Sequence, residues 1–384
     1  MQSREDFQTT ADAIVIGGGV AGLTVATALG QRGLSVVVIE RERPGAEASA
    51  AAAGMLAPQA EADCADSFFQ LAAAARDYYP AYAAMLREET GLDIELDQTG
   101  TLYLAFTGAD ENELEHRYAW QAGAGMSVER LTAAEVLALE PAISSEVRMA
   151  LRFPHDGQVE NRRLIAALIA LAEARRVRLM SHTVVTALRI ESERVRGVET
   201  SRGAFDAAVV VVAAGAWTPF IEVSGGSQAQ LPRIEPVRGQ MLCFEARPRL
   251  VRHVVYSPRG YLVPRRDGRL LAGSTSERAG LDKSVTVGGL HAITTHALEI
   301  APRVAELPLI EAWAGLRPRA QDDLPVLGAH PGVRGLYYAT GHYRNGILLA
   351  PLTGEMVAQM IVAGTTAPLV EAFGLERFHQ DVRC

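Results

Sequence analysis

The chain has 384 residues, of which 48% are hydrophobic and 21% are charged, the balance of an ordinary globular protein. That length predicts two or three domains with a large buried core, which excludes disorder, collagen and small disulfide scaffolds as descriptions of the whole chain. The net charge of −8 favours neither nucleic acid nor an anionic membrane as a partner, although a locally basic pocket can still bind a small anionic substrate.

The predicted elements open with a βαβ unit. A strand at residues 13–16 leads through a glycine turn into a helix at 20–32, and a second strand follows at 34–40. Residues 48–57 are small and apolar around a central glycine, a composition that suits close approach of the backbone to a flat ligand.

The rest of the chain changes character along its length. Further helices are expected at 66–90, 110–140, 161–174, 289–305 and 352–362, and further strands at 102–106, 184–190, 195–200, 209–214, 240–245, 260–264, 269–273 and 336–339. We therefore predict an α/β fold in which a Rossmann-type dinucleotide-binding domain carries an inserted, mixed α+β substrate domain built on a largely antiparallel sheet. The first domain is expected to contain residues 1–60, 150–235 and 311–384, and the second residues 61–149 and 236–310.

The glycine turn carries a dinucleotide fingerprint. Gly17 permits the tight turn, Gly19 lets the backbone approach a pyrophosphate, and Gly22 lets the helix pack close to the strand. Glu40 ends the second strand, where its carboxylate can bind ribose hydroxyls and would repel the extra phosphate of NADP. No second fingerprint of this kind occurs in the sequence, which favours a flavoprotein, while an NAD-only dehydrogenase is the competing class.

Two segments near the end of the chain carry polar residues in apolar surroundings. Arg317 and Arg344 lie beside glycines and can bind a carboxylate through two hydrogen bonds, or else form structural ion pairs or face solvent. The hydroxyl of Tyr261 can assist a carboxylate, although a core aromatic is the more ordinary role. His342 is expected to be packed or hydrogen-bonded near the cofactor rather than to act as a base.

Cysteine usage and the apolar runs limit the setting of the protein. Cys64, Cys243 and Cys384 are odd in number and far apart, so we expect neither a metal site nor a disulfide framework. The polar N-terminus lacks the apolar core of a signal peptide. The apolar run at 346–364 is broken by proline, glycine and polar residues, so we expect a cytoplasmic protein with no membrane segment.

With these residues in place, the sequence resembles the glycine oxidase family of the D-amino acid oxidase-like flavoproteins over nearly its whole length. The segments that carry the resemblance are IVIGGGVAGL at 14–23, SAAAAGMLAP at 49–58, GQVENRRL at 157–164, EPVRGQML at 235–242, GYLVPR at 260–265, WAGLRPR at 313–319 and GHYRNGILLAP at 341–351.

The resemblance implies oxidative deamination of glycine and other small amines or D-amino acids, such as sarcosine and D-alanine. In that reaction a hydride passes from the substrate to flavin N5, O2 reoxidises the flavin to give H2O2, and water hydrolyses the imine to a 2-oxo acid and ammonia. In thiamine-making organisms the imine, dehydroglycine, feeds the thiazole ring. We expect a small substrate and O2 as partners, and a homo-oligomer.

The resemblance also assigns roles to single residues. Arg317 matches the arginine that binds the substrate carboxylate, Arg344 its companion and Tyr261 the assisting tyrosine, while Ser276 stands in the pocket where relatives can carry a bulkier residue. No cysteine lies where sarcosine oxidases tether their flavin, so FAD is expected to be noncovalent. The residues expected to bind FAD are Gly17, Gly19, Val20, Ala21, Gly22, Glu40, Arg41, Ala48, Ser49, Ala53, Gly54, Met55, Val185, His342, Tyr343, Arg344, Asn345, Gly346, Ile347 and Leu348.

Two alternatives to an oxidase stay open from the sequence. A D-amino acid dehydrogenase would pass its electrons to a quinone or a carrier, and peroxide formed in air would distinguish an oxidase from it. A dinucleotide-binding protein without catalysis would lack the yellow colour of bound flavin.

Overall fold

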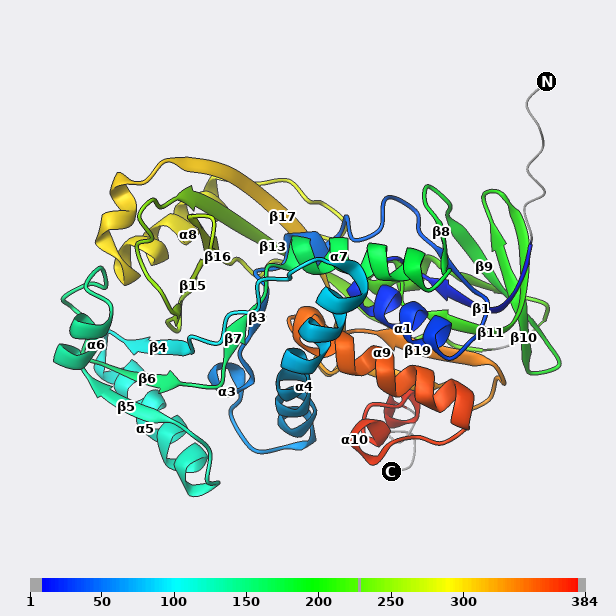
Figure 1. Ribbon diagram of the computed structural model, residues 1–384, viewed down its shortest axis with the longest axis horizontal. Helices are drawn as coiled ribbons and strands as arrows, with labels where there is room; N and C mark the ends of the chain where they lie inside the picture. The colour runs from blue at the N-terminus through cyan, green and yellow to red at the C-terminus, as the bar shows by residue number, and fades with distance from the viewer. Residues whose placement is uncertain (1–8, 227–228, 379–384) are drawn as a thin grey trace.

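The computed structural model describes residues 9–226 and 229–378, and in that part of the chain it forms two large sheets (Figure 1). The first sheet contains β1 (Thr10–Ile16), β2 (Val36–Ile39), β8 (Arg178–Met180), β9 (Val185–Glu191), β10 (Arg194–Thr200), β11 (Gly203–Val212), β12 (Glu222–Ser224), β18 (Val326–Ala329) and β19 (Leu336–Thr340). Its centre is parallel, in the order β8–β2–β1–β11–β19, and this doubly wound order confirms the predicted Rossmann-type α/β fold.

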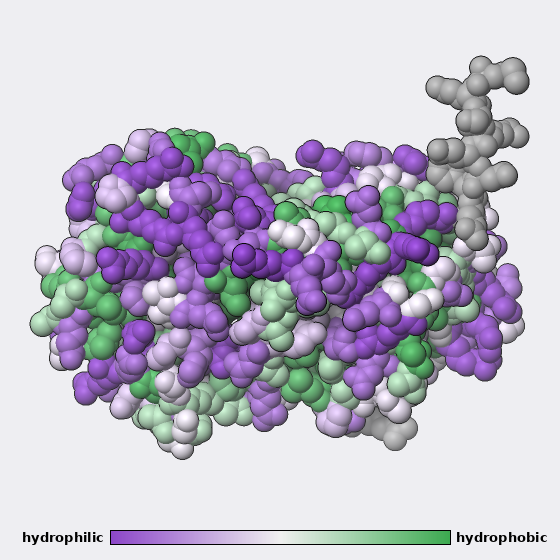
Figure 2. Space-filling model, in the orientation of Figure 1, coloured by the Kyte–Doolittle hydropathy of each residue, from purple (hydrophilic) through white to green (hydrophobic). Residues whose placement is uncertain are grey.

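The second half of β1, residues 13–16, is buried on both faces, which explains its continuous apolar sequence. Ala13 and Val15 pack against helices on one face, whereas Ile14 and Ile16 pack against β9, β10 and β11 on the other. Figure 2 shows hydrophilic residues spread over the face drawn there, with apolar residues in smaller areas between them. The helices that cover this sheet and its cavity edge are α1 (Val20–Gln31), α2 (Ala48–Ala51), α3 (Pro58–Glu61), α4 (Ser67–Thr90), α7 (Asn161–Ala174), α9 (Gly346–Ala363) and α10 (Pro368–Glu371), with 3-10 turns η1 (Gly215–Phe220) and η3 (Leu375–Phe378).

Helix α9 is long and apolar enough to cross a membrane, but 61% of it is buried inside the protein. It packs between α1 and α4, so it is a core helix beside the first sheet (Figure 1). The helix begins at Gly346, six residues before the predicted start, and Pro351 lies inside its second turn. Its N-terminus therefore lies at the turn that follows β19.

The second sheet is largely antiparallel, as predicted. Its order is β17–β13–β16–β15–β14–β4–β6–β5, and β14 pairs with β4 in parallel. Its strands are β4 (Thr101–Ala105), β5 (Glu129–Thr132), β6 (Met149–Phe153), β13 (Ile234–Glu245), β14 (Val254–Tyr256), β15 (Tyr261–Pro264), β16 (Arg269–Gly273) and β17 (Leu309–Ala320). The elements around it are α5 (Gly108–Gly123), α6 (Ala133–Leu139), α8 (Val287–Ile300) and η2 (Pro302–Glu306), and a small ladder joins β3 (Met55–Leu56) to β7 (Gly157–Gln158).

Strands β13 and β17 form a long antiparallel ribbon that runs from the first sheet to the second (Figure 1). β17 is paired along its length with β13, although the predicted division assigns residues 311–384 to the dinucleotide domain. β6 likewise pairs in the second sheet, and α4 packs in one core cluster with α7 and α9 of the first. The division into domains stays a prediction, and these pairings show where its bounds and the sheets differ.

Two further predicted helices are wrong in extent. The single helix at 110–140 is two helices separated by β5, because α5 ends at Gly123 and Gly125 follows with a φ of +74°. A capping box of Thr132 and Glu135 then starts α6. The helix at 289–305 ends at Ile300, since Pro302 cannot continue the α-helical hydrogen bonding.

The contact between α1 and α9 gives a stability test. A Cβ at Gly354 would lie 2.6 Å from the carbonyl carbon of Thr24, which is backbone and cannot move aside. We expect Gly354→Ala to lower the free energy of unfolding by about 1–3 kcal/mol. Gly288→Ala in α8 is the control, because a Cβ there meets nothing and should stabilise by up to about 1 kcal/mol. Equal urea midpoints for the two variants would contradict the close crossing.

Candidate active site

A cavity of about 500 Å³ lies at the carboxyl ends of the central parallel strands. The residues that follow β1, β2, β11 and β19 all line it, as is usual for ligand sites in doubly wound sheets. Residues from β13, β15 and β17 of the second sheet line its other side. The predicted residues that line it are Gly17, Gly19, Val20, Ala21, Glu40, Arg41, Ala48, Ser49, Ala53, Gly54, Met55, Val185, Tyr261, Arg317, His342, Tyr343, Arg344, Asn345, Gly346 and Ile347.

The glycine turn brings the start of α1 against the cavity. Gly17 has a φ of +104°, and a Cβ on it would lie 2.5 Å from the carbonyl oxygen of Ala213. Gly22 packs so closely that a Cβ on it would lie 1.9 Å from the carbonyl oxygen of Gly17. Gly22 does not line the cavity. It therefore supports the cofactor site by allowing α1 to pack closely against β1, not by contacting the cofactor itself.

Glu40 is fixed beside this turn at the end of β2. One carboxylate oxygen accepts a hydrogen bond from the Gly18 amide at 2.7 Å, and the other accepts from the Glu42 amide at 2.8 Å. The side chain is buried and lines the cavity. Its neighbour Arg41 lies 4.0 Å above the Trp217 ring, and both also line the cavity.

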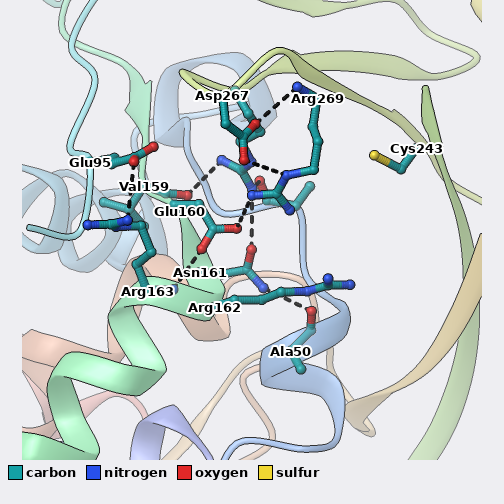
Figure 3. Close-up of polar contacts among 12 residues, drawn as sticks. Ala50, Glu95, Val159, Glu160, Asn161, Arg162, Arg163, Cys243, Asp267 and Arg269 are labelled. Atoms are coloured by element: carbon teal, nitrogen blue, oxygen red, sulfur yellow. Dashed lines mark hydrogen bonds and ion pairs between the residues drawn. The ribbon is translucent and has the colours of Figure 1, made fainter. Parts of the chain in front are cut away.

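The segment 48–55 is tied in place by side chains from distant elements. Asn161 donates to the carbonyl oxygens of Ser49 and Ala50, and Figure 3 shows its side chain directed toward Ala50. The Trp313 indole donates to the Ala51 carbonyl at 3.0 Å. The Ser49 hydroxyl in turn accepts from the Val20 amide at the start of α1. The small residues of this segment thus form one rigid wall of the cavity.

Arg265, part of the GYLVPR segment, secures the same wall, a role that was not predicted for it. Its buried guanidinium donates to the Ala53 carbonyl at 2.7 Å, to the Val159 carbonyl and to Asn161 Oδ1. Burial lowers the pKa of Arg265 to about 10, so it stays charged at neutral pH. The carboxylates of Glu160 and Asp267 offset part of the charge of Arg265. Both also pair with Arg269, which lies between them (Figure 3).

The turn between β19 and α9 holds the predicted histidine. His342 is buried, and its Nε2 lies 3.2 Å from Thr353 Oγ1. Burial lowers the pKa of His342 to about 4, so the ring is neutral at pH 7 and is packed and hydrogen-bonded, as predicted. Leu348 belongs to the core of α9 and does not line the cavity, because one helical turn carries it away from the opening.

A row of paired residues crosses the second sheet at the cavity. Met241 pairs with Gly273, Gly273 with Tyr261, and Tyr261 with Tyr256. Directly opposed residues point to the same face of a sheet, so this row forms a wall. Gly273 leaves room in which the Tyr261 hydroxyl approaches Met241 Sδ at 3.3 Å.

Arg317 projects from β17 over Gly239, where a Cβ would lie 2.3 Å from its Nη1. It donates to Ser274 Oγ at 2.7 Å and to the Thr275 carbonyl at 3.0 Å, both neutral partners. Within residues 9–226 and 229–378, no carboxylate lies within ion-pair distance of it. A positioned guanidinium without a counter-ion suits a carboxylate ligand.

Arg344 differs, because it already has a carboxylate partner. Its Nη2 lies 3.2 Å from Glu61 Oε1, and the same oxygen accepts a hydrogen bond from the Tyr256 hydroxyl at 2.7 Å. The charge of Glu61 is the main reason that the pKa of Arg344 lies above its usual range. Glu61 lines the cavity, yet nothing in the sequence around it distinguishes it from glutamates expected at the surface.

The structure corrects the position of the pocket serine. Ser276 is exposed and does not line the cavity, whereas Ser274 does and contacts Arg317. The chain leaves β16 after Gly273, and Glu277 then pairs with Arg238, which places Ser276 on the outer side of this connection. Strand β16 ends at Gly273, so the alternation of side chains between the two faces of a strand does not continue to Ser276.

Comparison with known proteins decides the family. The model of the family described as FAD dependent oxidoreductase matches residues 12–360. The chain belongs to this family. Glycine oxidase of Geobacillus kaustophilus is 37% identical over 95% of this chain and 97% of its own length. The crystal structure of glycine oxidase from that organism has a TM-score of 0.91 at 36% identity, covering 96% of this chain and 99% of that one.

Two further relatives broaden the comparison. The bifunctional protein ThiO/ThiG of Synechocystis is 34% identical over 97% of this chain, which spans 55% of that protein. The crystal structure of L-proline dehydrogenase from P. horikoshii has a TM-score of 0.86 at 25% identity and covers 98% of this chain and 99% of that one. These findings confirm the resemblance to glycine oxidases and the prediction of an oxidoreductase that uses FAD.

The described residues fit FAD. The glycine turn leaves room for a pyrophosphate at the start of α1, and Glu40 is placed for ribose hydroxyls. The wall 48–55 consists of small residues as far as Gly54 and ends in Met55. Neither Cys64 nor Cys243 lines the cavity, and Cys384 lies outside the described residues.

Glu40 gives a test of the cofactor site. Glu40→Ala removes the acceptor for the ribose hydroxyls, which costs about 1.5–3 kcal/mol for charged hydrogen bonds. We expect the dissociation constant of FAD to rise about tenfold or more. Glu42→Ala is the matched control, because its side chain is half exposed and does not line the cavity. Equal FAD affinities of the two variants would remove Glu40 from the ribose site.

His342 predicts a pH dependence of stability. Its pKa is about 4 in the folded protein against 6.5 ordinarily, so the unfolded chain binds a proton first as the pH falls. The stability that neutral His342 contributes is complete above pH 6.5 and is lost toward pH 4, by about 3 kcal/mol at most. The free energy of unfolding of His342→Asn should therefore fall less over this interval. Parallel pH profiles for the variant and the parent would refute a buried neutral ring.

Proposed function

We propose that the protein oxidises glycine and other small amines or D-amino acids, such as sarcosine and D-alanine, with O2 as acceptor. The products are H2O2 and an imine, which water hydrolyses to a 2-oxo acid and ammonia, or to a 2-oxo acid and methylamine when the substrate is sarcosine. The observation that carries the proposal is Arg317, a partly buried guanidinium in the FAD cavity whose described partners are neutral. The similarity to glycine oxidase over nearly the whole chain supports the same substrate class.

Binding and orientation are the main contributions of the protein. Arg317 would hold the α-carboxylate through two hydrogen bonds, and Ser274 and the Thr275 carbonyl fix the plane of its guanidinium. Tyr261 lies on the adjacent wall, where its hydroxyl can turn from Met241 toward the same carboxylate. A substrate anchored in this way presents its Cα–H bond in one direction.

FAD, when bound, supplies the acceptor of two electrons. The amine must be neutral when the Cα–H bond breaks, since its lone pair assists, and the mainly apolar lining disfavours the ammonium form. The N-terminus of α9 has no side-chain cap and faces the cavity at Asn345 and Gly346, so its amides favour negative charge there. No acid or base is assigned, because His342 is buried and hydrogen-bonded to Thr353.

We propose that the imine formed from glycine supplies the thiamine thiazole. The match to the bifunctional protein ThiO/ThiG over 97% of this chain supports this role. The cytoplasmic location and the homo-oligomer expected from the sequence stay predictions.

The alternative function is that of a dehydrogenase that passes electrons to a carrier. The similarity to L-proline dehydrogenase supports this alternative. The test is a panel of glycine, sarcosine and D- and L-amino acids, with peroxide and oxygen uptake measured in air. Prompt peroxide from glycine supports the oxidase. Flavin reduction by the substrate without peroxide, and turnover with a quinone, would support the dehydrogenase.

Replacement of Arg317 tests the carboxylate site. Loss of one partner of a buried charged pair costs about 2–5 kcal/mol, so Arg317→Ala should lower kcat/KM for glycine roughly 30-fold to several-thousand-fold. Arg317→Lys should recover part of it, because an ammonium lacks the planar fork. Simple primary amines, which have no carboxylate, should lose much less.

Arg319→Ala is the matched control for this substitution. Arg319 lies two residues further along β17, pairs with Glu235 and Asp323, and does not line the cavity. An equal fall for glycine and for simple amines in Arg317→Ala, with flavin still bound, would make Arg317 structural.

A further inference from the structure

We infer that Glu61 determines how many carboxylates a substrate can carry. By neutralising Arg344 it leaves Arg317 as the cation available to a substrate, and it excludes amino acids whose nitrogen bears a second, carboxymethyl group. This inference rests on the proposed function and goes beyond it, because it concerns which amino acids the site rejects.

The first support is the way in which Glu61 is held. It ends α3, and its Oε1 accepts from Tyr256 at 2.7 Å while it pairs with Arg344 at 3.2 Å. Tyr256 is buried, and burial and the neighbouring Glu61 raise the pKa of its hydroxyl well above the usual value, so it stays a donor. Glu61 is thus fixed by two donors from two different elements.

The short helix beneath Glu61 is also anchored. The carboxylate of Asp156 accepts from the Ala60 amide at 3.1 Å, and Arg76 pairs with Asp156 at 3.2 Å. The Gln59 side chain donates to Gln121 at 3.0 Å. The helix that carries Glu61 is therefore held from below, which opposes withdrawal of Glu61 from Arg344 when a second anion approaches.

The second support is position along the wall. The Tyr256 and Tyr261 rings are 5.5 Å apart, and Tyr261 contacts Met241, which lies two residues from Gly239 on β13. Arg317 lies over Gly239. The wall thus has a cationic end at Arg317 and an end at Glu61 and Arg344 whose charges cancel.

The charges explain the rejection. A carboxylate that approaches Arg344 meets a guanidinium already paired with Glu61, and it is repelled by Glu61 at short range. Specificity can arise from such an unfavourable contact with the wrong ligand as well as from contacts with the right one. Glycine and sarcosine carry one carboxylate and avoid this contact, whereas iminodiacetate carries a second carboxylate in the carboxymethyl group on its nitrogen.

The experiment compares kcat/KM for iminodiacetate and glycine in the holoenzyme and in Glu61→Gln. The glutamine keeps the shape but frees the charge of Arg344, so the ratio should rise about tenfold to a hundredfold, on the scale of a charged hydrogen bond. The change should come mainly from a lower KM for iminodiacetate. Glu47→Gln is the matched control, because Glu47 also lines the cavity but pairs with Arg41 and Lys283, and it should leave the ratio unchanged.

A second variant tests the inference if Glu61→Gln loses its flavin or fails to fold. Tyr256→Phe removes one of the two groups that hold Glu61 and should raise the same ratio to a smaller extent. An unchanged ratio in the variants that still oxidise glycine, or an equal rise in Glu47→Gln, overturns the inference. If the parent enzyme itself does not oxidise glycine, the proposed function fails, and that outcome is distinct from failure of the specificity role.

Discussion

The site depends on one charge that the described residues leave uncompensated, the guanidinium of Arg317. Such a charge is costly to bury, and it is tolerated here because Ser274 and the Thr275 carbonyl satisfy part of its hydrogen bonding. Gly239 is equally necessary, since any side chain at that position would occupy the space of the guanidinium. The remaining charge is available to a carboxylate, and the rest of the cavity is arranged around that anchor.

The long ribbon of β13 and β17 brings this anchor to the cofactor site. Its register opposes Gly239 to Gly315, and a Cβ at Gly315 would lie 2.4 Å from the side chain of Ala51 in the FAD wall. The second sheet can therefore approach the first closely enough for both to line one cavity. Arg265 reinforces the junction by binding the Ala53 carbonyl. Substrate binding and cofactor binding are consequently linked through backbone contacts of small residues.

The sequence predicted much of this architecture because the relevant signals are local. The glycine turn and Glu40 follow from one βαβ unit, and most predicted cofactor residues line the cavity. The prediction of one long helix at 110–140 was wrong because apolar periodicity alone did not reveal that the helix ends at Gly123. Glu61 and Ser274 could not be found, since their roles arise from contacts with Arg344 and Arg317 far away in the chain.

The most direct test of the account is an anaerobic titration of the FAD-loaded protein with glycine, followed through the visible absorbance of the flavin. We expect glycine to bleach the yellow colour, and admission of air to restore it with formation of H2O2. Acetate, which has the carboxylate but no amine, should perturb the spectrum without bleaching it, and should do so only weakly in Arg317→Ala. A flavin that glycine leaves oxidised, or that acetate perturbs equally in the parent and in Arg317→Ala, would contradict the account.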